Sequence, residues 1–134
     1  ISIMKKLMLL ITLFYGFLTT SICAQETIWF DKDLQKIKKQ DAVYYKIGNK
    51  LEGEVSYFYK NKNIYKKFFL VAGKPEGKYA EYYESGELKA AGKYKNDAKD
   101  GNWKEYYKTG KIKEKGRYSE GDKVGIWKVF YKND

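Results

Sequence analysis

The chain has 134 residues, with 27 Lys or Arg, 17 Asp or Glu and a formal net charge of +10. It contains no His, and its single Cys is Cys23. Without imidazole, the sequence lacks the partner that Ser–His and Cys–His nucleophiles require, and it lacks the usual ligands of a His/Cys zinc site. We therefore assign no catalytic residues, no metal site and no cofactor.

Residues 1–24 have the pattern of a secretory signal peptide. Lys5 and Lys6 precede an apolar run at residues 7–18, and small and polar residues follow as far as Ala24. The run is shorter than the roughly 20 apolar residues of a membrane-spanning helix. We expect cleavage after Ala24 and export to the periplasm or the cell exterior. The alternative is lipid anchoring at Cys23, for which Ile22 is a poor preceding residue.

The charge is spread along the chain and does not gather in a tail. Removal of Lys5 and Lys6 with the leader would leave a net charge of +8. Arg117 is the only arginine, whereas nucleic-acid grooves favour Arg for bidentate contacts. The balance indicates solubility and loose attraction to anionic surfaces, and we do not expect nucleic acid as a partner.

Residues 25–52 differ from the rest and predict capping strands with a loop. Trp29 and Phe30 open a strand-like piece, and residues 33–40 are Lys-rich and predict an exposed loop or a short helical turn. Residues 42–47 are apolar and aromatic, as in a strand. We expect this segment to cover one end of a sheet.

The remainder is an internal repeat with a period of 24 residues. Units begin at Gly77, Gly101 and Gly125, and the positions that follow also agree between units. An earlier copy at 53–76 is degenerate, because Lys62 and Phe68 stand where later units have glycine. The units are thus 53–76, 77–100, 101–124 and a partial one at 125–134. The repeated positions, which we expect to be structural, are Gly77, Tyr79, Gly86, Gly92, Gly101, Trp103, Gly110, Gly116, Gly125 and Trp127.

Within each unit the pattern has a period of two, which predicts strands. In the second half of one unit, Leu88, Ala90 and Gly92 are expected on one face and Lys89 and Ala91 on the other. Tight turns are predicted at residues 84–87 and 108–111, and connecting turns at 95–100 and 119–124. The sequence therefore predicts an all-β fold in which hairpins lie side by side in one antiparallel meander.

Gly92 and Gly116 lie inside predicted strands, where glycine normally weakens a sheet. A missing side chain leaves room for an aromatic ring to lie across the backbone. Tyr79, Trp103 and Trp127 are the candidates. Each large ring buries about 150–250 Å², so these rings should form the core.

Pairs of aromatic residues recur near the predicted turns. Because neighbours in a strand point to opposite faces, one ring of each pair could be core and the other exposed. An exposed row could stack on a partner, whereas a single-layer sheet also needs aromatic cover on both faces. The candidate binding residues are Tyr82, Tyr106, Phe130, Tyr83, Tyr107 and Tyr131.

Glu81 and Glu105 share one repeat position, and Val129 replaces them in the last unit. Paired carboxylates can serve acid–base chemistry. The replacement and the absence of another catalytic partner favour a structural role.

The unit G-x-[WY]-x-x-[YF]-Y-x-x-G-x-[IL]-x-x-x-G-x-Y resembles the MORN repeat, and more narrowly the bacterial MORN variant that is often labelled a toxin–antitoxin antitoxin component. Residues 77–131 carry the clear resemblance and 53–76 a weaker one, and the segments IWFDKD and AVYYKIG are similar to the leader of exported bacterial members. The resemblance implies an elongated single layer of stacked MORN-type β-hairpins that binds or scaffolds proteins or phospholipids, with no catalytic residues to carry over.

These observations predict an exported, non-enzymatic binding or scaffold module that recognises a protein through its sheet face. One alternative is a peripheral binder of anionic membrane surfaces through lysines and rings, including the Lys-rich turns at 60–67 and 93–99. Another is an antitoxin-like inhibitor of a toxin. Self-association through an edge strand at residues 126–131 is a further expectation.

Overall fold

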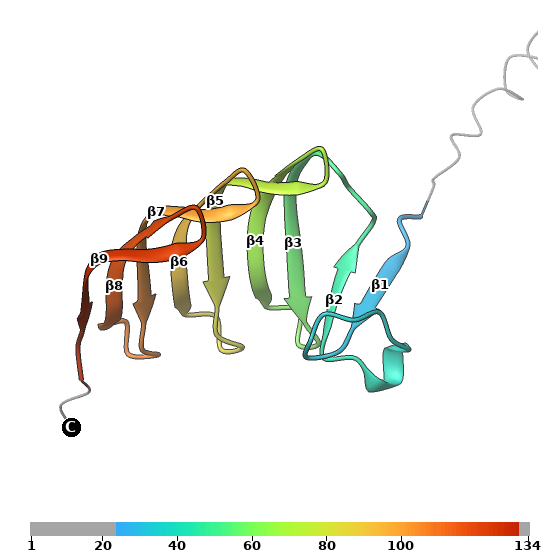
Figure 1. The fold of residues 1–134 in the computed structure, drawn as a ribbon. Coiled ribbons are helices and arrows are strands. Elements are labelled where there is room, and N and C mark those ends of the chain that lie inside the picture. Colours follow the sequence, from blue (N-terminus) through green and yellow to red (C-terminus); the bar gives the residue numbers. More distant parts are fainter. Residues whose placement is uncertain (1–23, 132–134) are drawn as a thin grey trace, which may run out of the picture.

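The computed structural model describes residues 24–131 and shows nine strands in one antiparallel sheet. The strands follow one another across the sheet in chain order (Figure 1), as the period-two pattern predicts. Their bounds are β1 Thr27–Phe30, β2 Tyr44–Ile47, β3 Gly53–Tyr59, β4 Ile64–Val71, β5 Lys74–Tyr82, β6 Leu88–Lys95, β7 Ala98–Tyr106, β8 Ile112–Ser119 and β9 Asp122–Val129. The predicted leader, including Cys23, lies outside the described residues except for Ala24.

The strands are longer and their links shorter than the sequence predicts. The predicted connecting turns at 95–100 and 119–124 are mostly strand, because β6 ends at Lys95 and β7 begins at Ala98. Asn96 and Asp97 make this link with φ of 50° and 66°, the left-handed pair of a type I′ turn. A two-residue turn with that twist lets both strands continue into it, so the prediction of a longer connection was wrong.

The first unit keeps its hairpin turn although it lacks the expected glycine. Lys62 adopts φ of 74°, in the same left-handed region as Gly86 and Gly110 in the later units. The side chain of Asn61 accepts a hydrogen bond from the backbone N–H of Asn63, which stabilises a local turn of the kind that Asn favours. The degenerate copy therefore has the same hairpin architecture.

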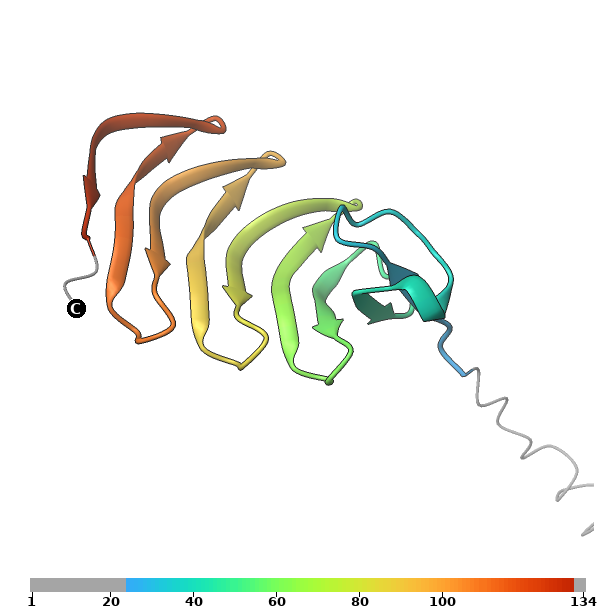
Figure 2. The ribbon, with the colours of Figure 1, turned by 90° about the horizontal axis from the view of Figure 1, so that it is seen from below.

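A glycine bends every second strand. Gly77, Gly101 and Gly125 have φ of 77°, 70° and 65°, a conformation that costs glycine little. Near these glycines the strands turn, and each hairpin acquires two arms, which Figure 2 shows as a bent outline repeated along the sheet. We call the face inside the bend the inner face and the opposite one the outer face.

A bulge near each hairpin turn changes which residues share a face. Glu81 pairs with Ala90, but Tyr82 pairs with Leu88, so Lys89 is an extra residue. Since paired residues share a face, Leu88 lies on the face opposite Ala90. The prediction that Leu88 and Ala90 share a face was wrong, because the bulge adds one residue to the alternation. The bulged Lys89 instead reaches Glu81, at 2.8 Å.

The N-terminal segment packs on the first end of the sheet. Beside β1, Ile37 donates its backbone N–H to the Trp29 carbonyl at 3.0 Å. Residues Lys39–Asp41 form a short 3-10 helix, labelled η1, and Phe30 and Ala42 are buried. None of the described residues forms a helix long and apolar enough to cross a membrane.

Candidate binding surface

The inner face is a continuous layer of aromatic rings. Each ring centroid lies 5.0–6.2 Å from the next, the usual range for packed rings. In order across the sheet the rings are Phe30, Tyr57, Phe68, Tyr79, Trp103, Tyr118 and Trp127. Among the described residues, the buried side chains are Phe30, Ala42, Val55, Ala90 and Trp103. The two largest of them, Phe30 and Trp103, belong to this ring layer, which therefore forms the core.

The two strand glycines lie beneath tryptophan rings, as the sequence predicts. A Cβ placed on Gly92 would lie 2.2 Å from Cδ2 of Trp103, and one on Gly116 would lie 2.2 Å from Cδ2 of Trp127. Trp103 is only 3% exposed, and its indole N–H donates to the Lys93 carbonyl at 3.1 Å. Tyr79 is the exception, since its ring packs against Trp103 and Phe68.

Lysines from the shorter arms close the inner face further. The Nζ atom of Lys99 lies 4.4 Å from the Trp103 ring centroid, and that of Lys123 lies 4.0 Å from the Trp127 centroid. Lys123 also forms an ion pair with Glu114 on the other arm. These cation–π contacts span the bend, so the inner face offers little free ring surface.

The repeated carboxylates Glu81 and Glu105 lie on the inner face, where Glu81 is engaged in hydrogen bonds. Glu81 accepts hydrogen bonds from the Tyr79 hydroxyl at 3.0 Å and from Lys89 Nζ at 2.8 Å. The hydrogen bond that Lys89 donates to Glu81 is the main reason that the pKa of Lys89 is raised. Glu105 lies opposite Glu114 in the register. Among the described residues, no group of three or more His, Cys, Asp or Glu could hold a metal ion.

Packing on the inner face raises the pKa of several tyrosines. Burial, reinforced by Tyr44, Glu81 and Glu84, raises the pKa of Tyr59 to about 12. Burial is also the main cause that raises the pKa of Tyr65 and of Tyr79, with the Glu81 charge adding to it. Burial lowers the pKa of Lys66, which lies 4.9 Å from the Tyr57 ring centroid.

These shifts predict a loss of stability in alkali. A raised folded-state pKa favours folding while the phenol is protonated, so that contribution is complete below pH 10, the ordinary pKa of tyrosine. It should fall as the pH rises from 10 through about 12, where Tyr59 ionises in the fold. Urea titrations at stepped pH, with tyrosinate absorbance recorded in parallel, would check this. A free energy of unfolding that stays constant above pH 10 would contradict it.

The candidate binding tyrosines divide into two groups. The hydroxyls of Tyr83 and Tyr107 donate to the backbone carbonyls of Tyr106 and Phe130, at 2.7 and 2.8 Å. Tyr59 makes the equivalent bond to the Tyr82 carbonyl at 2.9 Å. These hydroxyls join each hairpin end to the next unit and thus have a structural role, whereas Tyr131, the corresponding residue of the last unit, is 84% exposed.

The second group forms an apolar row on the outer face. Tyr82 pairs with Leu88 and Tyr106 with Ile112, and Phe130, which is 41% exposed, follows β9. The side chains of Tyr82, Leu88, Tyr106 and Ile112 are half-buried. The register thus gathers Tyr82, Tyr106 and Phe130 near the hairpin ends of one face.

A second row on the outer face was not predicted from the sequence. Each member is the register partner of the next across β4 to β9. In order, this outer row is Lys67, Ala80, Ala91, Lys104, Lys115 and Lys128. Its last three members put lysine directly opposite lysine on adjacent strands, an arrangement that normally destabilises a sheet.

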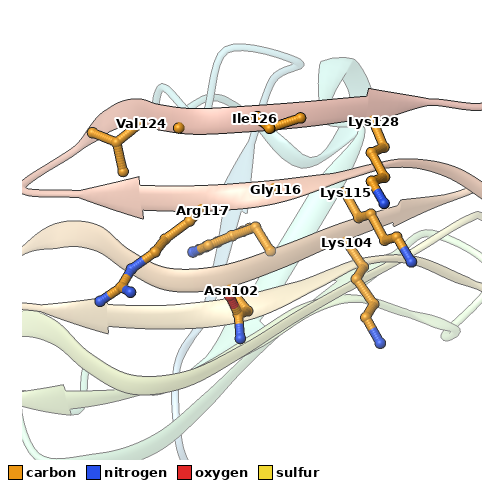
Figure 3. A pocket seen from close by; sticks show the side chains of 10 residues that line it. Asn102, Lys104, Lys115, Gly116, Arg117, Val124, Ile126 and Lys128 are labelled. Carbon is orange, nitrogen blue, oxygen red and sulfur yellow. The ribbon is translucent and has the colours of Figure 1, made fainter.

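Two hollows lie along the outer row. The larger, of about 490 Å³, is lined by the three lysines together with Asn102, Trp103, Gly116, Arg117, Val124, Gly125 and Ile126. Figure 3 shows Lys104, Lys115 and Lys128 projecting from three successive strands on one side of it, with Arg117 at its other end. The smaller, of about 300 Å³, is lined in part by Phe69, Ala80 and Ala91.

The outer row differs from one repeat unit to the next. Ala80 and Ala91 correspond to Lys104 and Lys115 one period later, whereas the glycines and rings of the inner face recur in both units. One part of each unit therefore maintains the sheet, and the other gives each segment of the outer face its own chemistry. This division favours the outer face as the candidate binding surface.

Comparison with known proteins agrees with the repeat architecture. Residues 75–96 and 99–120 each match the family model of the MORN repeat variant. No curated protein matches the chain. The two matched segments cover all but the first residue of the β5–β6 hairpin and all but the first residue of the β7–β8 hairpin, so these two hairpins are MORN-type repeats.

Proposed function

We propose that this protein is an exported, non-enzymatic binding module that recognises a protein partner through its outer face. The observation that carries the proposal is the contrast between the two faces. The inner face is filled by packed rings, with Trp103 3% exposed, whereas the outer face presents an apolar row, a row of lysines and two hollows.

Two further observations support parts of this proposal. MORN repeats are generally non-enzymatic modules, and two copies lie at the centre of the sheet. The basic and apolar pattern of residues 5–18 supports export. Turnover of any substrate that is abolished by Glu81→Gln or Glu105→Gln would overturn the non-enzymatic assignment.

Site-specific photo-crosslinking in the producing cell tests the binding face. A photoreactive amino acid at Lys104 lies on the outer row, and the matched control at Lys111 lies beside the hairpin turn. We expect one defined protein to be captured from position 104 and not from position 111. Equal capture from both positions, or no capture from either, would argue against the proposal.

A second candidate function is binding to an anionic membrane surface. The lysines on β7, β8 and β9 favour it, because basic residues near an anionic surface each contribute about 1 kcal/mol. Co-sedimentation with anionic vesicles across a salt series separates the two functions. Salt-sensitive sedimentation, combined with no captured protein, would support the membrane function.

A further inference from the structure

The outer face carries an unbalanced group of four cations. Lys104, Lys115, Lys128 and Arg117 line one hollow, and among the described residues none of them forms an ion pair with a carboxylate. Glu114, the residue before Lys115, lies on the inner face and pairs there with Lys123. Adjacent strands are about 4.8 Å apart, so the ammonium groups of neighbouring lysines in this row repel one another.

The smaller hollow next to these cations has a different character. Ala80 and Ala91 pair with each other, and their small side chains leave space that Phe69, 44% exposed, helps to enclose. Three charged residues, Glu54, Lys67 and Lys78, also line this hollow. A hollow of this kind can accept one apolar side chain. The outer row therefore offers a small position on β5–β6, with two alanines at its centre and charged side chains around it, and a basic position on β7–β9.

We infer that the partner presents an extended acidic segment, which lies across the strands along the outer row. Its carboxylates contact Lys104, Lys115 and Lys128, and one apolar side chain enters the alanine hollow. This inference rests on the proposed function and adds the chemistry of the partner. Carboxylates complement the positive charge of the lysines. Because the two hollows differ in character, they favour a polypeptide over a uniformly charged polymer.

The spacing of the strands determines how far apart the acidic residues and the apolar residue lie in the partner segment. From the middle of the β5–β6 pair to β8 is about 12 Å. An extended chain advances about 3.4 Å per residue. In the partner, about three or four residues therefore separate the apolar residue from the centre of a pair of acidic residues that lies over β8. Side chains at alternate positions point the same way, so the two acids stand two residues apart.

The inference is tested by selecting from a random dodecapeptide library displayed on phage, with the purified protein as bait. We expect enriched sequences with two acidic residues at alternate positions and an apolar residue about three or four positions away. An enriched peptide is then synthesised, labelled and titrated by fluorescence anisotropy. Its affinity should fall as salt is raised, because the contacts are ionic and exposed.

Lys115→Glu is the decisive variant. It should weaken the peptide on the order of tenfold. It should also leave the melting temperature unchanged or raise it, because a negative charge would stand between Lys104 and Lys128. Loss of folding would remove binding together with stability, so the two readouts separate recognition from structure. Lys95→Glu is the matched control, with the same change in net charge at an exposed position away from the hollow, and should retain binding.

Ala91→Phe tests the apolar position separately. It should fill the alanine hollow and remove the preference for the apolar residue, while the acidic preference stays. The inference would be overturned if no peptide were enriched, if enriched peptides lacked acidic residues, or if Lys115→Glu and Lys95→Glu caused equal losses of binding. Binding to anionic vesicles without peptide binding would overturn it too. A crosslinked partner whose binding does not depend on Lys115 would refute this inference and leave the proposed function intact.

Discussion

Replacing Trp103 by alanine should unfold the protein or weaken it severely. The ring lies between Tyr79, Tyr94 and Tyr118, at centroid distances of 5.3, 5.7 and 5.7 Å. Truncating a buried Trp to Ala typically costs about 3–5 kcal/mol. That is a large part of the roughly 5–15 kcal/mol that holds a typical domain folded.

The architecture makes this substitution worse than a simple cavity. A single-layer sheet has no second layer that could move to refill the space, and the ring also covers the backbone at Gly92. The lost indole N–H would leave the Lys93 carbonyl without its 3.1 Å hydrogen bond. Urea unfolding followed by circular dichroism would measure the loss.

Trp127→Ala is the matched control for position in the array. Trp127 covers Gly116 in the same way, but it is less buried than Trp103 and lies on β9, the last described strand. We expect a clearly smaller loss of stability than for Trp103→Ala. Equal losses would show that position in the array does not matter, whereas an unchanged midpoint for Trp103→Ala would show that the ring layer is not the core.

Much of the fold could be predicted from the sequence because one physical rule repeats every 24 residues. A glycine within a strand is unfavourable unless something occupies the space, and a large ring recurs at the matching position of each unit. The sequence therefore predicts hairpins in which a ring of one strand lies over a glycine of its neighbour, Trp103 over Gly92 and Trp127 over Gly116. The meander follows, because consecutive units must lie side by side for the rings to reach the glycines.

The candidate binding surface could not be predicted in the same way, because its residues meet only through bulges. Tyr106 pairs with Ile112, and a regular ladder continued from that pair would place Lys104 opposite Glu114. The bulge moves the register by one residue, so Lys104 faces Lys115 and Glu114 faces Glu105. A one-residue shift thus converts an expected ion pair into a basic outer face. Bulges depend on backbone geometry that no single residue type specifies.

The register also explains why two of the five predicted binding tyrosines, Tyr83 and Tyr107, have a structural role. Alternation predicts that one ring of each pair is exposed, but it does not identify a hydrogen-bond acceptor 23 residues away. The Tyr83 hydroxyl donates a hydrogen bond to the Tyr106 carbonyl because the stacking of adjacent hairpins brings the two groups together. Such a contact depends on how units stack, whereas the sequence pattern describes each strand alone.

Gly92→Ala should destabilise the protein by about 2–3 kcal/mol, although only one methyl group is added. The new Cβ would lie 2.2 Å from two ring carbons of Trp103, and the surrounding rings leave the indole no free direction in which to move. Alanine is otherwise slightly better than glycine in a strand, so a loss of this size can come only from the overlap. Lys93→Ala, at the exposed neighbour, should change stability by less than about 0.5 kcal/mol.

The degenerate first unit shows how such an overlap can be relieved. At the matching positions Phe68 replaces the glycine and Tyr79 replaces the tryptophan, and their rings stack with centroids 6.2 Å apart. Where the residue beneath the ring is larger than glycine, the ring above it is smaller than the indole of tryptophan. We expect Gly92→Ala combined with Trp103→Tyr to lose less stability than the sum of the two single losses, a coupling that a double-mutant cycle in urea measures directly. Strict additivity would mean that the glycine and the ring act independently, and it would remove the steric basis for the 24-residue repeat.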